Sequence, residues 1–268
     1  MAEPGLGPRA YLNALAGILW REGLRFLQQR SRLIAALVRP TLWLLVFAVG
    51  FRSMLEVARV PPYDMQIGYE TYVVPGLLGM IQLFNGMQSS LSLVVDRELG
   101  SMRILLAAPL PPGYLLFCKL LAGVAVSLVQ IVLFVLVAEA TVVDLPLLGL
   151  LRALPVLLLT GVMLGAIGLL LSATVRELEN FAGVMNFVIF PLFFLSSALY
   201  PLVQMRASSE LLYWISLLNP FTHAVEAIRF ALYGELAGQA LLVVAGCTAV
   251  GFVLALRGYR ARTEGTRR

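Results

Sequence analysis

The sequence has few charged residues and few cysteines. Of its 268 residues, 13% are charged and 60% are hydrophobic, with a mean hydropathy of +0.88. A soluble domain has about a quarter charged residues, so this composition argues against a soluble globular enzyme and against a disordered chain. Cys118 and Cys247 both lie inside apolar runs and cannot form a disulfide framework.

Motifs of several enzyme classes are also missing. The only lysine, Lys119, follows no glycine loop, so the chain has no G-x-x-x-x-G-K-[ST] motif and cannot bind ATP in that way. The only histidine, His223, excludes a two-histidine metal site, and no G-x-S-x-G motif marks a serine hydrolase. Glu177 and Glu179 are two residues apart and would point to different sides of a helix. We therefore expect no metal site and no catalytic residue.

Long apolar runs are the strongest signal that is present. A bilayer core of about 30 Å needs roughly 20 apolar residues in a helix. Six runs meet this requirement: Leu33–Phe51, Thr71–Val95, Tyr114–Ala138, Leu154–Thr174, Phe181–Tyr200 and Ala237–Leu256. They predict an all-α membrane protein with six transmembrane helices. The first run contains Arg39-Pro40, so its membrane part is expected to start near Pro40.

Residues 12–27 predict an amphipathic helix before the first run. Its apolar residues recur at i, i+3, i+4 and i+7, while Arg21, Glu22 and Arg25 lie on the other side. Such a helix can lie flat at the membrane surface, with Trp20 at the level of the headgroups. Packing against a neighbouring helix is the alternative.

The arginines predict the orientation of the six spans. With six spans both termini share one side, and thirteen arginines fall on that side against five on the other. Both termini are therefore expected in the cytoplasm. No Pro- or Gly-rich linker divides the chain, which predicts one domain: residues 1–32 as cytoplasmic tail and interfacial helix, 33–257 as the six-span domain, and 258–268 as a basic cytoplasmic tail.

The segment after the second run predicts a short cytoplasmic helix. Asp96 can cap it, and Leu99, Met102 and Leu106 form an apolar ridge. Three prolines stop it before the third run: Pro109, Pro111 and Pro112. A helix between two spans can be pushed by a soluble partner and move both spans. An ordinary charged turn is the alternative.

Prolines bound the region after the fifth run. Pro191 should kink that run and Pro201 should end it, although a tolerated kink is common in membrane helices. Asn219 is a good N-cap, Pro220 suits the first helical position and Gly234 suits the stop. These residues predict a helix on the extracytoplasmic side, which can dip into the membrane and return.

This helix carries three polar residues at i+3 steps. His223, Glu226 and Arg229 share one face, and Glu226 can pair with either neighbour. The opposite face is apolar, so the helix is amphipathic. A lone histidine in such a place is more often structural than catalytic.

Polar residues also mark the spans themselves. Gln82, Asn85 and Ser89 line one face of the second run, and Asn186 lies in the fifth. Such groups face either a water-filled path or a packed neighbouring helix, and the sequence leaves both open. The fourth run carries a stripe of small residues that predicts close helix packing: Gly161, Gly165 and Gly168.

Three segments together resemble a known family. Val95–Arg103 carries an acidic-basic-Glu-x-Gly-Ser stretch, Phe190–Pro201 is a proline-bounded fifth span, and Leu218–Arg229 reads Asn-Pro-x-Thr-His-x-x-Glu-x-x-Arg. In this order, within six predicted spans, they resemble the ABC-2 type permeases, nearest to the daunorubicin-resistance and nodulation-factor (lipooligosaccharide) exporter group. The chain departs from the family pattern at Ser197, where glycine is frequent, and at Arg103, where glutamate is frequent.

The resemblance implies roles for these segments. Residues 96–110 would be a coupling helix on a nucleotide-binding subunit, with the turn at Arg176–Asn180 as a second contact, and residues 202–234 would form an extracytoplasmic gate. The coupling residues would be Asp96, Arg97, Glu98, Gly100, Ser101, Met102, Arg103, Leu106 and Arg176. The gate residues would be Pro191, Pro201, Asn219, Pro220, His223, Glu226 and Arg229. The translocation path would include Gln82, Asn85, Ser89 and Asn186.

The resemblance also implies partners. A separate ABC ATPase would bind ATP and Mg²⁺, so that no cofactor is expected on this chain, and two permeases, identical or paralogous, would join two ATPases in a bacterial plasma (inner) membrane. Membrane lipid is an expected partner and nucleic acid is not. The cargo would be an amphipathic drug-like molecule, a lipid or a lipooligosaccharide, and export is favoured over import. The alternative is a non-ABC membrane scaffold or an intramembrane enzyme.

Overall fold

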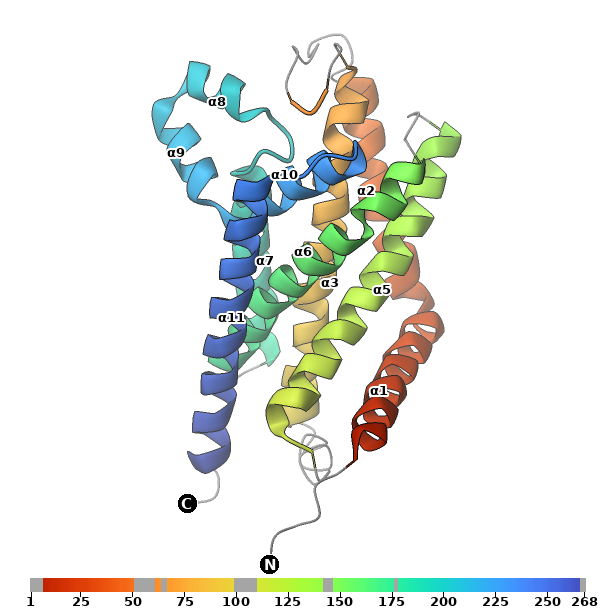
Figure 1. Ribbon diagram of the computed structural model, residues 1–268, viewed down its shortest axis with the longest axis vertical. Coiled ribbons are helices and arrows are strands. Elements are labelled where there is room, and N and C mark those ends of the chain that lie inside the picture. Colours follow the sequence, from red (N-terminus) through yellow and green to blue (C-terminus); the bar gives the residue numbers. More distant parts are fainter. Residues whose placement is uncertain are drawn as a thin grey trace, which may run out of the picture.

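The computed structural model describes residues 7–50, 61–63, 67–98, 110–141, 147–175 and 178–265. Within these ranges the chain forms ten helices, which confirms the prediction of an all-α fold (Figure 1). They are α1 (Pro8–Gln28), α2 (Arg30–Gly50), α3 (Tyr69–Glu98), α5 (Pro112–Thr141), α6 (Leu147–Thr174), α7 (Leu178–Phe194), α8 (Leu202–Ser208), α9 (Glu210–Leu218), α10 (Pro220–Leu232) and α11 (Gly238–Gly265).

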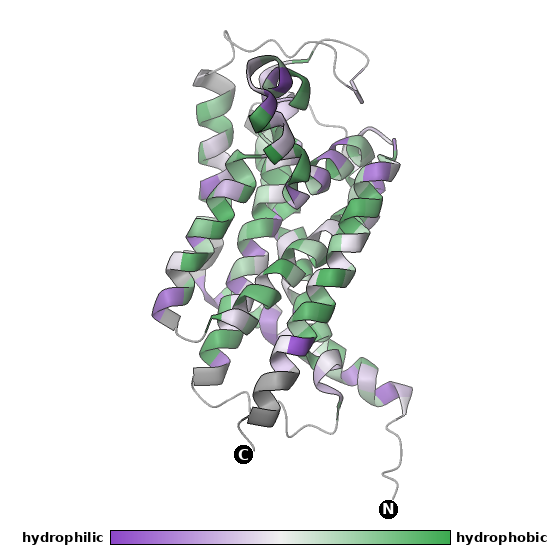
Figure 2. Cartoon of the chain, turned by 90° about the vertical axis from the view of Figure 1, so that its left-hand side faces the viewer, coloured by the Kyte–Doolittle hydropathy of each residue, from purple (hydrophilic) through white to green (hydrophobic). Residues whose placement is uncertain are grey.

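Each of the six predicted apolar runs coincides with a helix. The runs correspond to α2, α3, α5, α6, α7 and α11. Among the described residues, three helical segments are long and apolar enough to cross a membrane: Pro112–Ala140, Leu148–Thr174 and Gly238–Tyr259. Two further apolar segments, Ile34–Phe47 and Glu179–Phe194, are shorter. On the side seen in Figure 2, hydrophobic residues run along most of the helices.

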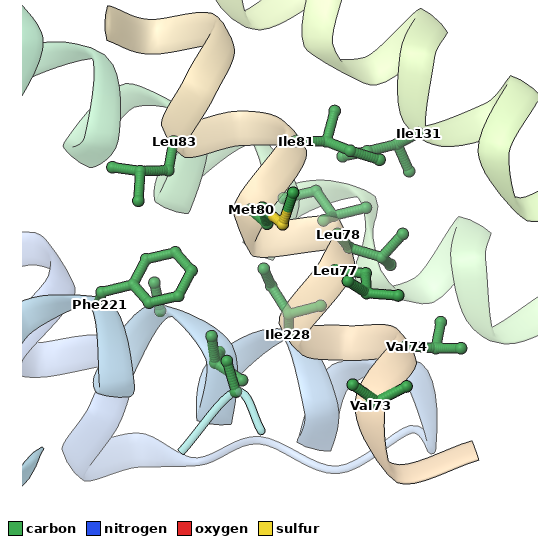
Figure 3. Packing of buried hydrophobic residues seen from close by; sticks show 14 of the residues in the cluster. Val73, Val74, Leu77, Leu78, Met80, Ile81, Leu83, Ile131, Phe221 and Ile228 are labelled. Carbon is green, nitrogen blue, oxygen red and sulfur yellow. The ribbon is translucent and has the colours of Figure 1, made fainter. Parts of the chain in front are cut away.

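Helix α3 occupies the centre of the bundle. It contacts α2, α5, α6, α7 and α10, and these neighbours shield it from the surroundings. Its first half is almost entirely buried, with side chains such as Leu77, Leu78 and Leu83 at 2% exposure or less. Figure 3 shows Phe221 and Ile228 of α10 beside the α3 segment that begins at Val73. Because α3 is enclosed by protein, it can carry polar residues that a lipid-facing helix could not.

Glycines allow α3 and α6 to approach closely. A Cβ atom at Gly86 of α3 would lie 3.0 Å from the Cα of Gly165 in α6, and a Cβ atom at Gly168 would lie 2.7 Å from the carbonyl oxygen of Gly86. Neither helix could hold a larger residue at these positions without moving apart. The glycine stripe of α6 therefore serves helix packing, as predicted.

Helix α1 packs along the first half of α5. Ile18 joins Leu115, Cys118 and Ala122 in a buried cluster, and the Tyr114 hydroxyl donates a hydrogen bond to the Tyr11 carbonyl at 2.7 Å. The packing that was the alternative for this helix is therefore present on one face. The rest of the surface still exposes large apolar side chains, namely Leu12, Trp20, Leu24 and Leu27, as an interfacial helix requires.

Two predicted boundaries are wrong. The fifth run was expected to reach Tyr200, but α7 ends at Phe194 and residues 195–200 form turns. The fourth run was expected to begin at Leu154, but the segment of α6 that is long and apolar enough to cross a membrane begins at Leu148. The last run, by contrast, ends within three residues of the apolar segment Gly238–Tyr259, and α11 continues beyond that segment to Gly265. Apolarity alone set the two wrong predictions. It does not reveal a turn that is held by hydrogen bonds, nor a helix that continues past a single charge such as Arg152.

Candidate functional site

One polar site lies where α3 meets α6, at the middle of both helices. The Gln82 side chain is 1% exposed, its Nε2 donates to the Leu157 carbonyl at 2.6 Å, and its Oε1 accepts from the Thr160 hydroxyl at 2.8 Å. Both ends of the amide are therefore satisfied inside the bundle. Gln82 acts as polar glue between two helices, which was one of the two interpretations left open by the sequence.

The other polar residues of α3 line two small cavities. Ser89 lies beside Lys119 and Ser127 on a cavity of about 20 Å³, which Gln82 also lines. Asn85 lies on a separate cavity of about 30 Å³ together with Arg39 and Gln130 of neighbouring helices. Volumes of this size hold about one or two water molecules.

Asn85 is incompletely satisfied in its buried position. Its Nδ2 donates to the Gly123 carbonyl at 3.5 Å, and its Oδ1 has no hydrogen-bond partner among the described residues. An orphaned amide oxygen beside a cavity is a natural site for a bound water. The polar face of α3 thus combines direct helix contacts with small hydratable spaces.

Asn186 lies apart from the other predicted path residues. It is exposed on α7 and lines a larger cavity of about 210 Å³ between α2, α3 and α7. Arg39 also lines this cavity and connects it with the cavity at Asn85. The four predicted path residues therefore do not line one common cavity. Arg39, Met80 and Phe84 line both the cavity at Asn85 and the cavity at Asn186, and Arg39 is the charged residue among them.

An ion pair joins α3 to α5 near one end of the bundle. Lys119 of α5 is buried and its ammonium donates to the carboxylate of Asp96, which lies two residues before the end of α3. Asp96 was expected to cap a new helix. That prediction is wrong, because α3 continues through this residue to Glu98 and the carboxylate turns towards α5.

Most of the predicted coupling residues lie outside the described part of the chain. These residues are Gly100, Ser101, Met102, Arg103, Leu106 and Arg176. Arg97 and Glu98 belong to the last turn of α3, but their side chains are also outside it. The role of these residues in coupling stays a prediction.

Asn219 connects α7 to α10. Its Oδ1 accepts from the backbone N–H of Phe221, which makes it the N-cap of α10, and its Nδ2 donates to the carbonyls of Leu192 and Leu195 at 2.8 and 2.6 Å. The predicted cap is thus confirmed, and Pro220 takes the first helical position after it. One side chain satisfies the start of one helix and the end of another.

The structure also places the predicted stop of α10 and the two remaining prolines of the predicted gate. Gly234 has a φ of +81°, a conformation that glycine adopts without strain, and it follows the end of α10 as predicted. Pro191 lies inside α7, three residues before its end, and Pro201 directly precedes α8. Pro201 therefore starts a short helix and does not terminate the fifth run.

A buried cationic cluster lies between α10 and the start of α3. We call it the Arg229 cluster; it comprises Tyr63, Tyr72, Ser197, Glu226 and Arg229. Arg229 is 1% exposed, pairs with Glu226, donates to the Ser197 carbonyl at 2.9 Å and stacks on the Tyr72 ring with its guanidinium carbon 4.1 Å from the centroid. The predicted polar face of α10 is therefore not a solvated face, because at Arg229 it is buried against α3.

Some polar atoms of the Arg229 cluster form no hydrogen bond within the described part of the chain. The hydroxyls of Tyr63 and Ser197 and the Nε of Arg229 are buried without a hydrogen-bond partner among the described residues. Burial raises the pKa of the Tyr63 phenol, which keeps it protonated as a donor. Each buried polar group without a partner costs free energy, so these atoms are natural sites for a bound water.

The third polar residue of α10 has a structural contact. The Nε2 of His223 lies 2.9 Å from the carbonyl oxygen of Leu217 at the end of α9. This contact joins two consecutive helices and agrees with the structural role expected for a lone histidine. In the described part of the chain no three His, Cys, Asp or Glu side chains come together to hold a metal ion.

Several residues that form or support these sites were not predicted from the sequence. Lys119 and Arg39 carried a visible signal, because each is a charge inside an apolar run. Tyr69 and Tyr72 carried none, although their hydroxyls donate to the carbonyls of Leu199 and Ser197 at 2.9 Å and hold the turn after α7. Only the fold brings these segments together, across more than 120 residues.

Known proteins are similar to most of this chain. The ABC-2 type transporter family matches residues 13–233. The transport permease ycf38 of Porphyra purpurea is 29% identical over 232 residues, which are 83% of this chain and 76% of that protein. The ycf38 permease of Cyanophora paradoxa is 29% identical over 251 residues, covering 85% and 84%. Nodulation protein J of Rhizobium leguminosarum bv. viciae is 31% identical over 88 residues, 33% of each chain.

Proposed function

The chain belongs to the ABC-2 type transporter family, and from this we propose that it is the membrane permease subunit of an ATP-driven exporter. Its relatives are transport permeases, so the chain serves transport and is not itself an enzyme. The match over residues 13–233 carries the proposal. The cargo is an amphipathic drug-like molecule, a lipid or a lipooligosaccharide, because apolar helices with few charges suit such a molecule better than an ion.

Helix α3 supplies a mechanical link within this proposal. It has 30 residues, and at a rise of 1.5 Å per residue it is about 45 Å long. One end holds Tyr72 under Arg229 of α10, and the other holds Asp96 against Lys119. Displacement of the segment after Glu98 by a partner would therefore move a helix whose far end supports α10.

The ATPase is a separate chain in this proposal. It binds ATP and Mg²⁺ and docks on residues 96–110, with residues 176–180 as a smaller contact. This second segment was predicted to be a turn, but its last three residues belong to α7. Two permeases, identical or paralogous, join two ATPases in the bacterial plasma membrane, surrounded by lipid. The six helices α2, α3, α5, α6, α7 and α11 span the bilayer, α1 lies at its cytoplasmic surface with both termini in the cytoplasm, and α10 acts as the extracytoplasmic gate. The domain division at residues 32 and 257 follows this arrangement.

Co-purification tests this proposal most directly. We expect the tagged chain, extracted from its host in mild detergent, to retain a soluble ATPase in roughly equal amount, identified by mass spectrometry. The double variant Arg97→Glu with Arg103→Glu should lose the ATPase, because it reverses two charges of the proposed docking segment. The control Arg206→Glu changes an exposed arginine of α8 and should retain it. Absence of an ATPase in both detergent and lipid nanodiscs would refute the exporter assignment.

A further inference from the structure

Arg39 places a positive charge in the middle of the bundle. It lies near the centre of α2, and its guanidinium carbon is 4.1 Å from the ring centroid of Phe84, which lies at the middle of α3. Gln82, half a turn away, bonds to Thr160 at the middle of α6. This level is far from the ends of the helices. An ionised side chain at such depth is costly and normally has a functional reason.

Arg39 differs from Lys119 and Arg229, the two cations that are buried in the described part of the chain. Lys119 is paired with Asp96, and Arg229 is paired with Glu226. No salt bridge of Arg39 occurs within the described ranges, and neither of the two cavities that it lines contains an aspartate or glutamate. The ring of Phe84 stabilises the guanidinium but does not neutralise it. The described residues that line the cavity between α2, α3 and α7 therefore carry a net positive charge.

The same cavity is otherwise apolar and aromatic. Its volume of about 210 Å³ is bounded by Trp43, Phe190, Phe193 and Phe194, with Asn186 as the second polar group. Trp43 packs against Phe194 with a centroid separation of 5.9 Å. Phe190 and Phe194 are 48% and 40% exposed, so the aromatic wall continues to the outer surface. The space suits a headgroup, with room for an apolar tail to leave along α7.

We propose that this cavity binds the anionic headgroup of an amphipathic molecule, a phosphate or carboxylate that carries an apolar tail. The inference rests on the proposed function, because it makes the cavity a cargo site of the permease. Arg39 holds the anion by charge-assisted hydrogen bonds, Asn186 adds an amide, and the aromatic wall packs on the tail. A cationic headgroup is rejected, because it would meet Arg39 without a compensating carboxylate.

Tryptophan fluorescence can test the site, because Trp43 lies in it. The chain has three tryptophans, and the other two, Trp20 and Trp214, are 72% and 52% exposed. With both replaced by phenylalanine, Trp43 reports alone. The protein is placed in phosphatidylcholine nanodiscs and titrated with 12-bromododecyl phosphate, whose bromine quenches tryptophan at contact. We expect saturable quenching and an apparent Kd at least tenfold weaker in Arg39→Gln.

Matched controls separate binding from partition into the bilayer. A protein that keeps only Trp214 should show linear, unsaturated quenching that Arg39→Gln leaves unchanged. The probe 12-bromododecyltrimethylammonium should quench Trp43 without saturation. Arg206→Gln removes an exposed arginine that stacks on Tyr213 and should leave the Kd of the phosphate probe within twofold. Equal affinity of the phosphate probe for the parent and Arg39→Gln, or saturable binding of the cationic probe, would overturn the proposal.

A second variant tests the site independently, in case Arg39→Gln does not fold. Asn186 is exposed, so Asn186→Asp should fold normally while it places a negative charge in the cavity. We expect this variant to bind the phosphate probe at least fivefold more weakly, and an unchanged Kd would count against the site. Adding phosphatidylglycerol to the nanodiscs identifies the source of the anion. If phosphatidylglycerol competes with the phosphate probe, the site binds a bilayer lipid. If it does not compete, the site binds a single-chain cargo.

The assay needs no ATPase, so the two proposals fail separately. Loss of phosphate binding in a protein that still co-purifies with its ATPase refutes the cavity assignment alone. Saturable, Arg39-dependent binding in a protein that never retains an ATPase refutes the exporter assignment and leaves an anion-binding membrane protein.

Discussion

Two ion pairs lie at opposite ends of α3 and are built differently. Arg229 and Glu226 are neighbours on α10, and the cation is also held by the Ser197 carbonyl and the Tyr72 ring. Lys119 and Asp96 come from two helices, and the ammonium has one hydrogen-bond partner in the described part of the chain. One cation is thus secured by three segments, while the other depends on a single contact between helices.

The difference between the two ion pairs indicates which end of α3 can move. Removing one partner of a buried pair leaves a charge without compensation, and this is costly. At the α10 end a rearrangement must preserve three interactions of Arg229 at once, although the unpartnered hydroxyls nearby offer replacements. At the other end, separation of α3 and α5 breaks the one hydrogen bond of the Lys119 ammonium within the described part of the chain. We therefore expect the Asp96 end to open first when a partner pushes on it.

Arg229→Met should have the largest effect on stability. It removes the ion pair, the Ser197 hydrogen bond and the stacking on Tyr72, and leaves the Glu226 carboxylate without its partner. We expect a loss of about 3–5 kcal/mol, seen as a strong decrease of the thermal unfolding midpoint in detergent. The control Arg206→Met changes an exposed arginine and should leave the midpoint nearly unchanged. A midpoint near that of the parent in Arg229→Met would show that the cluster does not hold α10.

The pair at the other end should show a smaller, coupled effect. We expect Lys119→Met and Asp96→Asn each to destabilise by about 1–3 kcal/mol, and the double variant to lose less than the sum by at least about 0.5 kcal/mol. The measurement is a double-mutant cycle from thermal or denaturant unfolding. Strict additivity would mean that the contact between α3 and α5 contributes nothing at this point.

Gln82→Leu tests the uncharged contact with α6, which lies between the two ends of α3. It removes two hydrogen bonds to α6 and leaves the Thr160 hydroxyl with backbone acceptors only. We expect a loss of about 1–2 kcal/mol and non-additivity with Thr160→Val in the same unfolding assay. Stability equal to that of the parent would favour the alternative role of Gln82, as part of a hydrated path.

Arg39→Gln should have the smallest effect on stability. Since Arg39 pairs with no carboxylate among the described residues, its loss removes the stacking on Phe84 and also the cost of a buried charge. We expect unfolding to change by less than about 0.5 kcal/mol, in contrast with Arg229→Met. A loss similar to that of Arg229→Met would assign Arg39 to the structure of the bundle and not to a ligand.

The helices could be predicted because their causes are local. Apolar runs near the length of a bilayer predicted six of them, and Asn219, Pro220 and Gly234 marked the ends of α10 because capping acts within a few residues. The turn after α7 could not be predicted in this way. Residues 195–199 contain no charge or proline that would end the apolar run, and the donors that hold the carbonyls of Ser197 and Leu199 belong to Tyr72 and Tyr69 of another helix.

The sequence by itself determined that this chain is a helical membrane protein, and its three ordered motifs pointed to the ABC-2 type family. Both follow from composition and short-range pattern. Only the tertiary structure decided which charges are neutralised. Lys119 and Asp96 meet across two helices, while Arg39 meets an aromatic ring and no carboxylate within the described ranges. Electrostatic pairing depends on distance in space, and in a bundle that distance is set by how the helices pack.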